Sequence, residues 1–162
     1  RFGRAEEAAP PGDQMLLMPL VTEVADNLGL PREGIIALDA DMDPALRIDA
    51  DRDQLYRVLS YLTRNAVQAI ESTGAEAKGS VSIIGRRAER IVQITVSDDG
   101  PGFPPRAREL LFQAFQGSTR RGGTGLGLAI AFELIAAHGG TMRLLDTEQG
   151  AAFEIRIPDR AT

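Results

Sequence analysis

The chain has 162 residues, of which 43% are hydrophobic and 25% are charged, and its formal net charge is −5. These values are typical of one globular domain that can bury a core, and the negative charge argues against a nucleic-acid-binding surface, which needs clustered basic residues. The absence of cysteine excludes disulfides, thiol catalysis and Cys-ligated metals, and a single histidine, His138, excludes a His-rich metal site.

The first 14 residues (RFGRAEEAAPPGDQ) are expected to be a linker, because two consecutive prolines and a glycine cannot lie inside a helix. Residues 15–160 are expected to form one domain. No apolar run approaches the roughly 20 residues that span a bilayer, and the opening Arg-Phe-Gly-Arg does not resemble a signal peptide. We therefore expect this domain to be cytoplasmic, while a longer parent protein can still be anchored in a membrane.

Four short segments come before the longest predicted helix. Residues 15–17 are expected to form a short strand. Residues 19–30 carry apolar side chains at helical spacing, with Gly29 as the stop signal. Residues 35–38 and 46–48 are short β-like runs separated by Asp and Pro turn residues.

The longest helix is predicted from residue 51 or 53 to about residue 72, because apolar residues recur there at intervals of three and four. The residues of this apolar stripe are Leu55, Val58, Leu59, Leu62, Ala66, Ala69 and Ile70. Two strands with alternating patterns are predicted next, at residues 81–87 and 90–97. Ala88 and Glu89 are predicted to form the tight turn between them.

Glycine dominates the second half of the chain, since ten of the 17 glycines lie between residues 99 and 150. Residues 100–123 are predicted to be a loop with one short helical piece. Residues 125–137 are predicted to be a helix that is apolar on nearly every side and therefore deeply buried. Gly139 and Gly140 are expected to end this helix.

Residues 141–146 and 152–157 are predicted to be the last strands. Five to six strands and about three helices are thus expected. Because they do not alternate regularly, the fold class is α/β in the α+β sense, a two-layer sandwich with a mixed sheet.

Asn65 lies at the border of the apolar stripe of the long helix. An amide in that position can face a cleft, where its oxygen suits a hard cation such as Mg²⁺. The simpler interpretation is a hydrogen bond to a neighbouring loop, and Asn65 alone favours the simpler one.

Asp98 ends a predicted strand, and Gly100 and Gly102 follow it in the segment DDGPGF. A fixed carboxylate at a strand end can accept a hydrogen bond from an exocyclic amine, and the two glycines let the backbone approach a flat ligand. An ordinary Asp/Gly/Pro turn without a ligand explains the same residues equally well.

Four glycines stand where the next helix starts, in GGTGLGL. Backbone N–H groups at a helix N-terminus bind phosphate, although the spacing is neither that of a Walker A loop nor that of a dinucleotide fingerprint. Glycines weaken a helix start unless the backbone itself is used, so we favour phosphate binding here. Phe112 and Phe115 are either two core aromatics or the anchor of a mobile lid over residues 116–122.

In their order and spacing these segments resemble the Bergerat-type nucleotide-binding domain of two-component sensor histidine kinases. RNAVQAI around Asn65 resembles the N box of that family, and DDGPGF from Asp98 resembles its G1 box. LFQAF, with Phe112 and Phe115, resembles the F box, and GGTGLGLAI resembles the G2 box. The resemblance covers nearly everything after the linker, and four boxes in sequence are far more specific than any one of them.

The resemblance implies ATP and Mg²⁺ as ligands. Asp98 would read the adenine amino group beside Gly100 and Gly102, and Asn65 would hold Mg²⁺ against the phosphates, with Gln68 close by on the same helix. The residues implied around the phosphates are Gly123, Thr124, Gly125, Leu126 and Gly127. Arg120 and Arg121 would either reach the γ-phosphate, which suits an arginine, or be solvated loop charges.

Three departures from the family pattern stand out. Tyr61, four residues before Asn65, replaces an Asn that is frequent in the family or the Glu of its ATP-hydrolysing relatives. Gln68 stands where a Lys is frequent. Ala151 and Ala152 replace a Ser or Thr that commonly follows the glycine, and all three changes are expected to lower nucleotide affinity.

The resemblance therefore implies an ATP-dependent protein-histidine kinase domain. Its phosphoacceptor histidine would lie on a separate helical hairpin of the parent protein, which would also form the dimer, and a response regulator would receive the phosphoryl group. Neither nucleic acid nor membrane contact is expected. The alternatives are a degenerate module that docks a response regulator and a related ATPase. Tyr61 disfavours the ATPase, because hydrolysis needs a carboxylate near the attacking water.

His138 is expected to be structural and not the phosphoacceptor. It ends an apolar helix and precedes two glycines, so its ring is placed to meet the last helical carbonyls.

Overall fold

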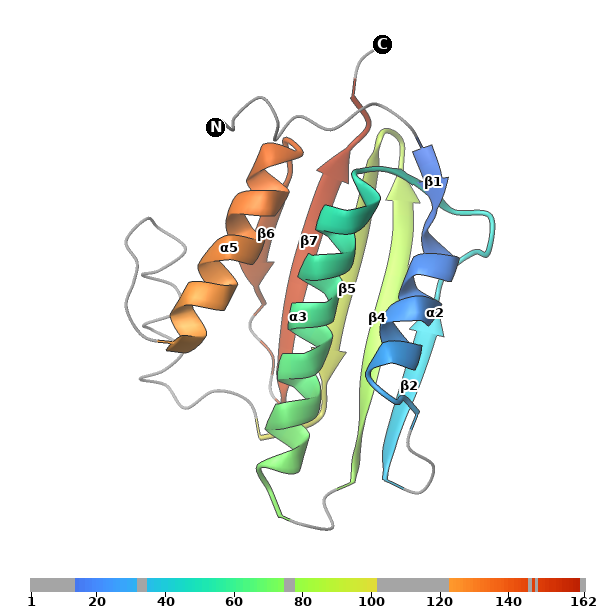
Figure 1. Ribbon diagram of the computed structural model, residues 1–162. Helices are drawn as coiled ribbons and strands as arrows, with labels where there is room; N and C mark the ends of the chain where they lie inside the picture. The colour runs from blue at the N-terminus through green and yellow to red at the C-terminus, as the bar shows by residue number, and fades with distance from the viewer. Residues whose placement is uncertain are drawn as a thin grey trace.

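The structure, a computed structural model, describes residues 14–31, 35–74, 78–101, 123–145, 147 and 149–160. In this part of the chain three helices cover one face of a five-stranded sheet (Figure 1). The helices are α2 (Leu17–Asn27), α3 (Arg52–Glu71) and α5 (Gly123–Ala137). The predicted two-layer sandwich is confirmed.

The sheet is mixed and has the strand order β2–β4–β5–β7–β6. Its strands are β2 (Ile36–Asp41), β4 (Gly79–Ala88), β5 (Ile91–Asp98), β7 (Ala151–Pro158) and β6 (Thr141–Leu144). The β2–β4 pair is parallel, and the other neighbours are antiparallel. The two remaining short strands, β1 (Gln14–Leu16) and β3 (Arg47–Asp49), pair with each other in a separate sheet.

The long helix α3 forms where its apolar periodicity predicts it. Its N-cap is Asp51, whose side chain accepts a hydrogen bond from the backbone N–H of Gln54 at 2.9 Å, which satisfies one of the free donors of the first turn. Leu55, Leu59 and Leu62 are almost completely buried. Burying each such side chain contributes about 2 kcal/mol, so this stripe holds α3 on the sheet.

The start of α2 differs from the prediction. The helix begins at Leu17, two residues before the expected position, and contains Pro19. Proline is tolerated in the first turn, where its missing N–H has no helical acceptor. The predicted stop is confirmed, since Gly29 has φ +70° and its N–H donates to the carbonyl of Asp26.

Two strand boundaries also differ from the prediction. β2 continues to Asp41 because Asp39 and Asp41 point to solvent while the alternate residues, Leu38 and Ala40, face inward. The β4–β5 turn lies one residue later than expected, with Glu89 in the left-handed region at φ 59°. The end of β2 was missed because its acidic residues interrupt the run of apolar residues on which the prediction relied.

The prediction that α5 is deeply buried is wrong. Leu128, Ala131 and Ile135 are buried, but Ile130 is 39% exposed. The reason is position: among the described helices α5 lies at the edge of the layer, with α3 on one side and no described helix on the other (Figure 1). None of the helices within the described residues is both long and apolar enough to span a membrane.

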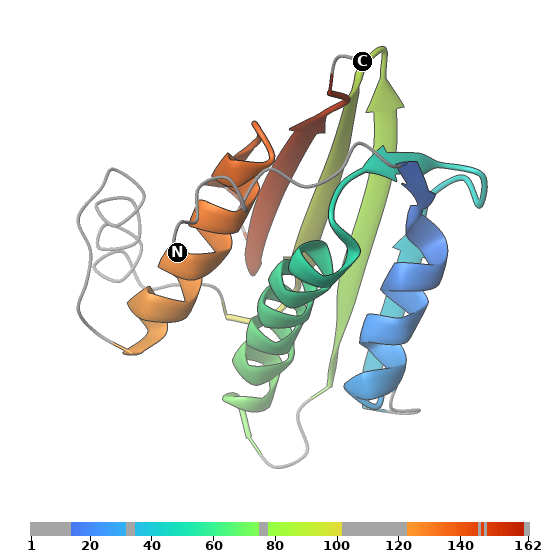
Figure 2. The same cartoon turned by 45° about the horizontal axis from the view of Figure 1, so that its top comes forward.

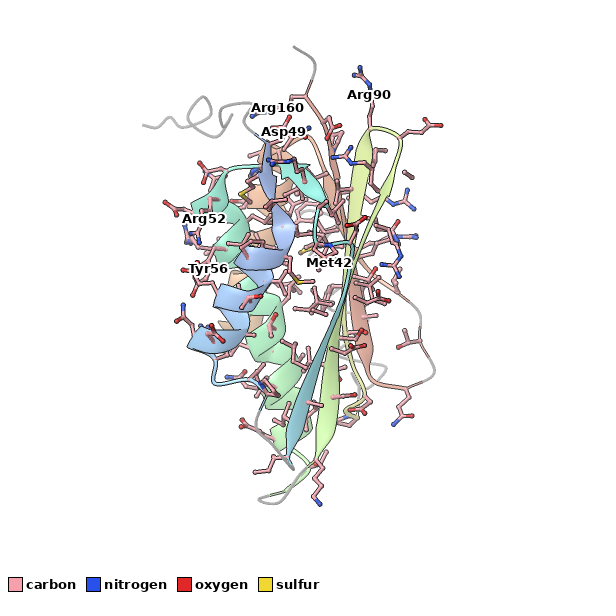
Figure 3. All side chains as sticks on the ribbon, turned by 90° about the vertical axis from the view of Figure 1, so that its right-hand side faces the viewer. Met42, Asp49, Arg52, Tyr56, Arg90 and Arg160 are labelled. Atoms are coloured by element: carbon pink, nitrogen blue, oxygen red, sulfur yellow. The ribbon has the colours of Figure 1, made fainter. Side chains whose placement is uncertain are left out.

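The other face of the sheet carries no helix in the described part of the chain (Figure 3). Near the C-terminus the chain is tied back to β3, because Asp49 accepts hydrogen bonds from the backbone N–H of Arg160 at 2.7 Å and from its guanidinium at 3.1 Å. Figure 3 shows the two residues side by side. Asp49 is only 4% exposed, so this pair closes one end of the core.

Candidate functional site

Three of the predicted motifs meet along the second half of α3. In Figure 1 the C-terminal end of α3 and the end of β5 lie at the lower end of the molecule, and the beginning of α5 is the lower end of that helix, about level with the middle of α3; Figure 2 shows the beginning of α5 beside the lower half of α3. The segments that the sequence singled out for chemistry are thus brought together by the fold, although 33 residues separate Asn65 from Asp98 and 25 separate Asp98 from Gly123 along the chain.

Gly100 brings the loop after β5 directly onto α3. A Cβ atom built on Gly100 would lie 3.3 Å from the carbonyl carbon of Ala69 and 3.3 Å from the backbone nitrogen of Ile70. Asn65 lies one helical turn before Ala69, and Gln68 lies directly before it. The close approach that favours glycine here is therefore to the helix backbone, and it places Asp98 and Asn65 around the same junction.

Asp98 ends β5 and is half-buried. Its Oδ1 accepts a hydrogen bond from the N–H of Gly100 at 2.8 Å. Burial raises the pKa of this carboxyl above its ordinary value, and the charge of Asp99 raises it further, while backbone hydrogen bonds from Gly100 and Ala151 act in the opposite direction. A half-buried carboxylate held by backbone N–H groups is an oriented hydrogen-bond acceptor.

The neighbouring Asp99 is turned to β4 instead. Its carboxylate accepts hydrogen bonds from the backbone N–H of Ser80 at 2.9 Å and from the Ser80 hydroxyl at 3.1 Å. The two adjacent acids therefore differ in role: Asp99 holds the end of β5 against β4, and Asp98 is left for another partner.

Sequence reasoning missed two glycines that shape this end of the sheet. Gly150 has φ +72°, and a Cβ atom there would overlap the carbonyl group of Asp98, with its carbonyl carbon at 2.8 Å. A Cβ atom on Gly79 would lie 2.7 Å from Oδ1 of Asp99. Their position in the sequence could have identified them, since Gly79 opens a strand of the central sheet and Gly150 directly precedes one.

Tyr61 brings α5 to the same place. A Cβ atom on Gly127 would lie 2.8 Å from Cζ and 3.0 Å from the hydroxyl oxygen of Tyr61. Tyr61 is one turn before Asn65 on α3. Asn65 therefore lies between two close approaches, that of Gly127 to Tyr61 and that of Gly100 to Ala69.

Some predicted residues lie outside the described part of the chain. They are Gly102, Phe112, Phe115, Arg120 and Arg121, together with the expected lid over residues 116–122. The backbone of Gly123, Thr124, Gly125 and Leu126 forms the first turn of α5, which begins two residues earlier than predicted. Among the described residues, no group of three or more His, Asp and Glu side chains is arranged to hold a metal ion.

His138 lies at the other end of α5. It is 3% exposed. One ring nitrogen, Nδ1, lies 2.8 Å from the carbonyl oxygen of Leu134, and the other, Nε2, accepts a hydrogen bond from the backbone N–H of Asp51 at 3.0 Å. The predicted contact with the last helical carbonyls is confirmed, and both ring nitrogens are engaged within the fold.

The chain matches known proteins over most of its length. The model of the family of histidine kinase-, DNA gyrase B- and HSP90-like ATPases matches residues 50–161. The sensory histidine kinase/phosphatase NtrB of Escherichia coli O157:H7 is 35% identical over 145 residues, which are 85% of this chain and 39% of that protein. The chain thus spans about two fifths of the length of this relative.

Solved structures agree in fold. The catalytic domain of histidine kinase ThkA, in a nucleotide-free form, is 27% identical with a TM-score of 0.73, covering 93% of this chain and 97% of that domain. Histidine kinase ThkA in complex with response regulator protein TrrA is 26% identical with a TM-score of 0.70, covering 91% of this chain and 42% of that one.

Proposed function

This chain belongs to the family of histidine kinase-, DNA gyrase B- and HSP90-like ATPases, and we propose that it transfers the γ-phosphoryl group of ATP to a histidine on a separate helical hairpin. Its domain type is the ATP-binding catalytic domain of sensor histidine kinases. The observation that supports the proposal is that α3 is approached on either side of Asn65, by Gly127 at Tyr61 and by Gly100 at Ala69.

The adenine end of the proposed site is built around Asp98. A half-buried, oriented carboxylate that is still available for a partner fits the exocyclic amine of a flat base. The approach of Gly100 to α3 forms one wall beside it. In this proposal Asp98 accepts a hydrogen bond from the adenine amino group, and Gly102 is a further proposed contact of the base.

The phosphate end of the proposed site lies between α3 and α5. The first turn of α5 begins at Gly123, and its backbone N–H groups have no helical acceptor of their own. Asn65 supplies an amide oxygen on the facing helix, a suitable ligand for Mg²⁺. When bound, Mg²⁺ would offset the charge of the phosphates during transfer. Gln68, Arg120 and Arg121 are proposed as further phosphate contacts, with Phe112 and Phe115 anchoring the lid.

Phosphoryl transfer needs positioning and charge neutralisation, so the domain itself needs no nucleophile. His138 is an unsuitable acceptor because it is buried, has both ring nitrogens engaged, and lies at the far end of α5 from the proposed phosphate site. The acceptor is therefore proposed to lie on the parent protein, in a hairpin outside this chain.

A transfer assay tests the proposal. Incubated with labelled ATP and Mg²⁺, this chain should leave itself unlabelled and should label the parent's hairpin, added separately, with acid-labile phosphate. Acid-labile label on His138 would contradict the assignment. Absence of ATP binding would instead favour a module that only docks a response regulator.

The related ATPase remains the competing enzyme. Hydrolysis requires a carboxylate near the attacking water, and the position one turn before Asn65 holds Tyr61. Slow ATP turnover without the hairpin supports a kinase, whereas rapid turnover supports an ATPase.

A response regulator is the proposed recipient of the phosphoryl group. One solved structure similar to this chain is histidine kinase ThkA in complex with response regulator protein TrrA, which supports this choice. The name of NtrB adds a second candidate function, phosphatase activity of the parent protein toward that regulator. Loss of phosphate from the phosphorylated regulator, measured with and without the full parent protein, tests it.

A further inference from the structure

Tyr61 and Gly127 form a close approach between α3 and α5 at the proposed site. The hypothetical Cβ atom of Gly127 would lie well inside contact distance of the Tyr61 ring, 2.8 Å from Cζ. Real Cβ atoms do not approach carbon atoms so closely, so the ring occupies the space that any other residue would need at position 127. In this chain the lack of a side chain at 127 is thus explained by the ring.

Tyr61 has the bulk and the packing of a spacer between the two helices. It is partly buried and packs against the main hydrophobic core. An aromatic side chain of this size has few rotamers and limits how closely the facing helix can approach. The approach of α5 to α3 is therefore set by the ring at this point.

The position of the contact connects it to the proposed phosphate site. Tyr61 is one helical turn before Asn65, and Gly127 is the fifth residue of α5, directly after the turn that begins at Gly123. A change in the separation of Tyr61 and Gly127 would move the first turn of α5 relative to Asn65.

We propose that Tyr61 is a positioning residue, matched to Gly127, that sets the distance between Asn65 and the first turn of α5. This inference rests on the proposed function, in which those two groups hold the phosphates of ATP. It reverses the expectation from the family pattern, in which Tyr61 only weakens binding. It also assigns Gly127 to the helix contact and not to the phosphate.

A double-mutant cycle separates the two explanations for Gly127. The variants are Gly127→Ala, Tyr61→Ala and the double variant, with Tyr61→Phe as the conservative control that keeps the ring. The contact borders an open hollow of about 410 Å³, lined by residues of α2, α3 and α5, so α5 can shift to accept the added methyl group while the ring keeps its place. Gly127→Ala should therefore fold, which circular dichroism and urea unfolding check.

The readout is the dissociation constant of ATP with Mg²⁺, measured by calorimetry beside the free energy of unfolding. In the otherwise unmodified chain, Gly127→Ala should weaken ATP binding roughly tenfold, which is a usual coupling for residues in contact. In the Tyr61→Ala background the same change should weaken it less than about twofold. Tyr61→Phe should bind ATP within about twofold of the unmodified chain, because the ring is kept.

Three other outcomes would contradict the inference. Equal loss from Gly127→Ala in both backgrounds would assign this glycine to the phosphate. Lower stability of Tyr61→Ala with unchanged ATP affinity would reduce the contact to a purely structural one. Failure of the unmodified chain to bind ATP would refute the proposed function itself and the inference with it, which the first titration reveals.

Discussion

The backbone N–H of Asp51, the N-cap of α3, donates a hydrogen bond to Nε2 of His138 at the end of α5. Because Nε2 accepts, the ring proton must be on Nδ1, which then donates to the carbonyl oxygen of Leu134. One neutral imidazole thus joins the N-terminus of one helix to the C-terminus of the other. This connection lies at the opposite end of the helices from Asn65.

Replacing His138 should destabilise the fold without removing the proposed chemistry. His138→Ala leaves a buried N–H of Asp51 without its partner and opens a cavity, so unfolding in urea should require about 2–3 kcal/mol less. Thr141→Ala, at a nearby exposed position in β6, should change stability by less than about 0.5 kcal/mol. Phosphotransfer to the hairpin should persist at temperatures where His138→Ala is folded, and its complete loss there would point to a chemical role.

The raised pKa of Asp98 predicts that replacing this residue changes the stability of the fold in a pH-dependent way. A carboxyl whose pKa is higher in the folded state than in the unfolded chain favours folding when protonated, and that contribution is lost as the pH rises through the folded pKa. At neutral pH the ionised Asp98 therefore costs stability, so Asp98→Asn should stabilise the nucleotide-free fold. The gain should shrink as the pH falls through the raised pKa, and urea unfolding across that range measures it. A gain that grows on acidification would contradict the sign.

The same substitution should weaken nucleotide binding. Asp98→Asn replaces a charged acceptor by a neutral amide, so the affinity for ATP should fall roughly tenfold. GTP lacks the adenine amino group. It should bind weakly to both the unmodified chain and Asp98→Asn, and its affinity should change little between them. Equal losses for ATP and GTP in calorimetry would argue against adenine recognition.

Asn65 should matter only when Mg²⁺ is present. Asn65→Ala should reduce the affinity for ATP with Mg²⁺ at least about tenfold and have a smaller effect when EDTA is added, because the amide is proposed to act through the cation. The matched control is Gln93→Ala, an amide on β5 within the sheet, which should leave binding unchanged. Unchanged binding by Asn65→Ala would remove this residue from the site.

Gly150 should be far less tolerant of a side chain than Gly29, although both have φ near +70°. Gly29→Ala meets no atom within 4 Å, so it should cost only the left-handed backbone penalty of about 1–2 kcal/mol. Gly150→Ala adds an overlap with the carbonyl group of Asp98 and should cost more and also weaken ATP binding. Similar unfolding free energies for the two variants would contradict the close approach.

The elements of the fold were predictable wherever a local pattern specifies them. The stripe of α3 and the glycine after α2 act within a few residues, so reading the chain in order suffices. The exposure of Ile130 on α5 was not predictable, because the composition of that helix is apolar all round, and only its place at the edge of the layer leaves one side without a neighbouring helix among the described residues.

The candidate site divides in the same way. The sequence by itself determined which residue types were present: the Asn of the long helix, the carboxylate at a strand end and the glycines before the last long helix, each recognisable from its neighbours. Only the tertiary structure decided why particular glycines are needed. Gly100 meets α3, Gly127 meets the ring of Tyr61 and Gly150 meets the carbonyl of Asp98. These partners lie tens of residues away along the chain. Steric exclusion between them arises only when the packed layers bring their backbones together.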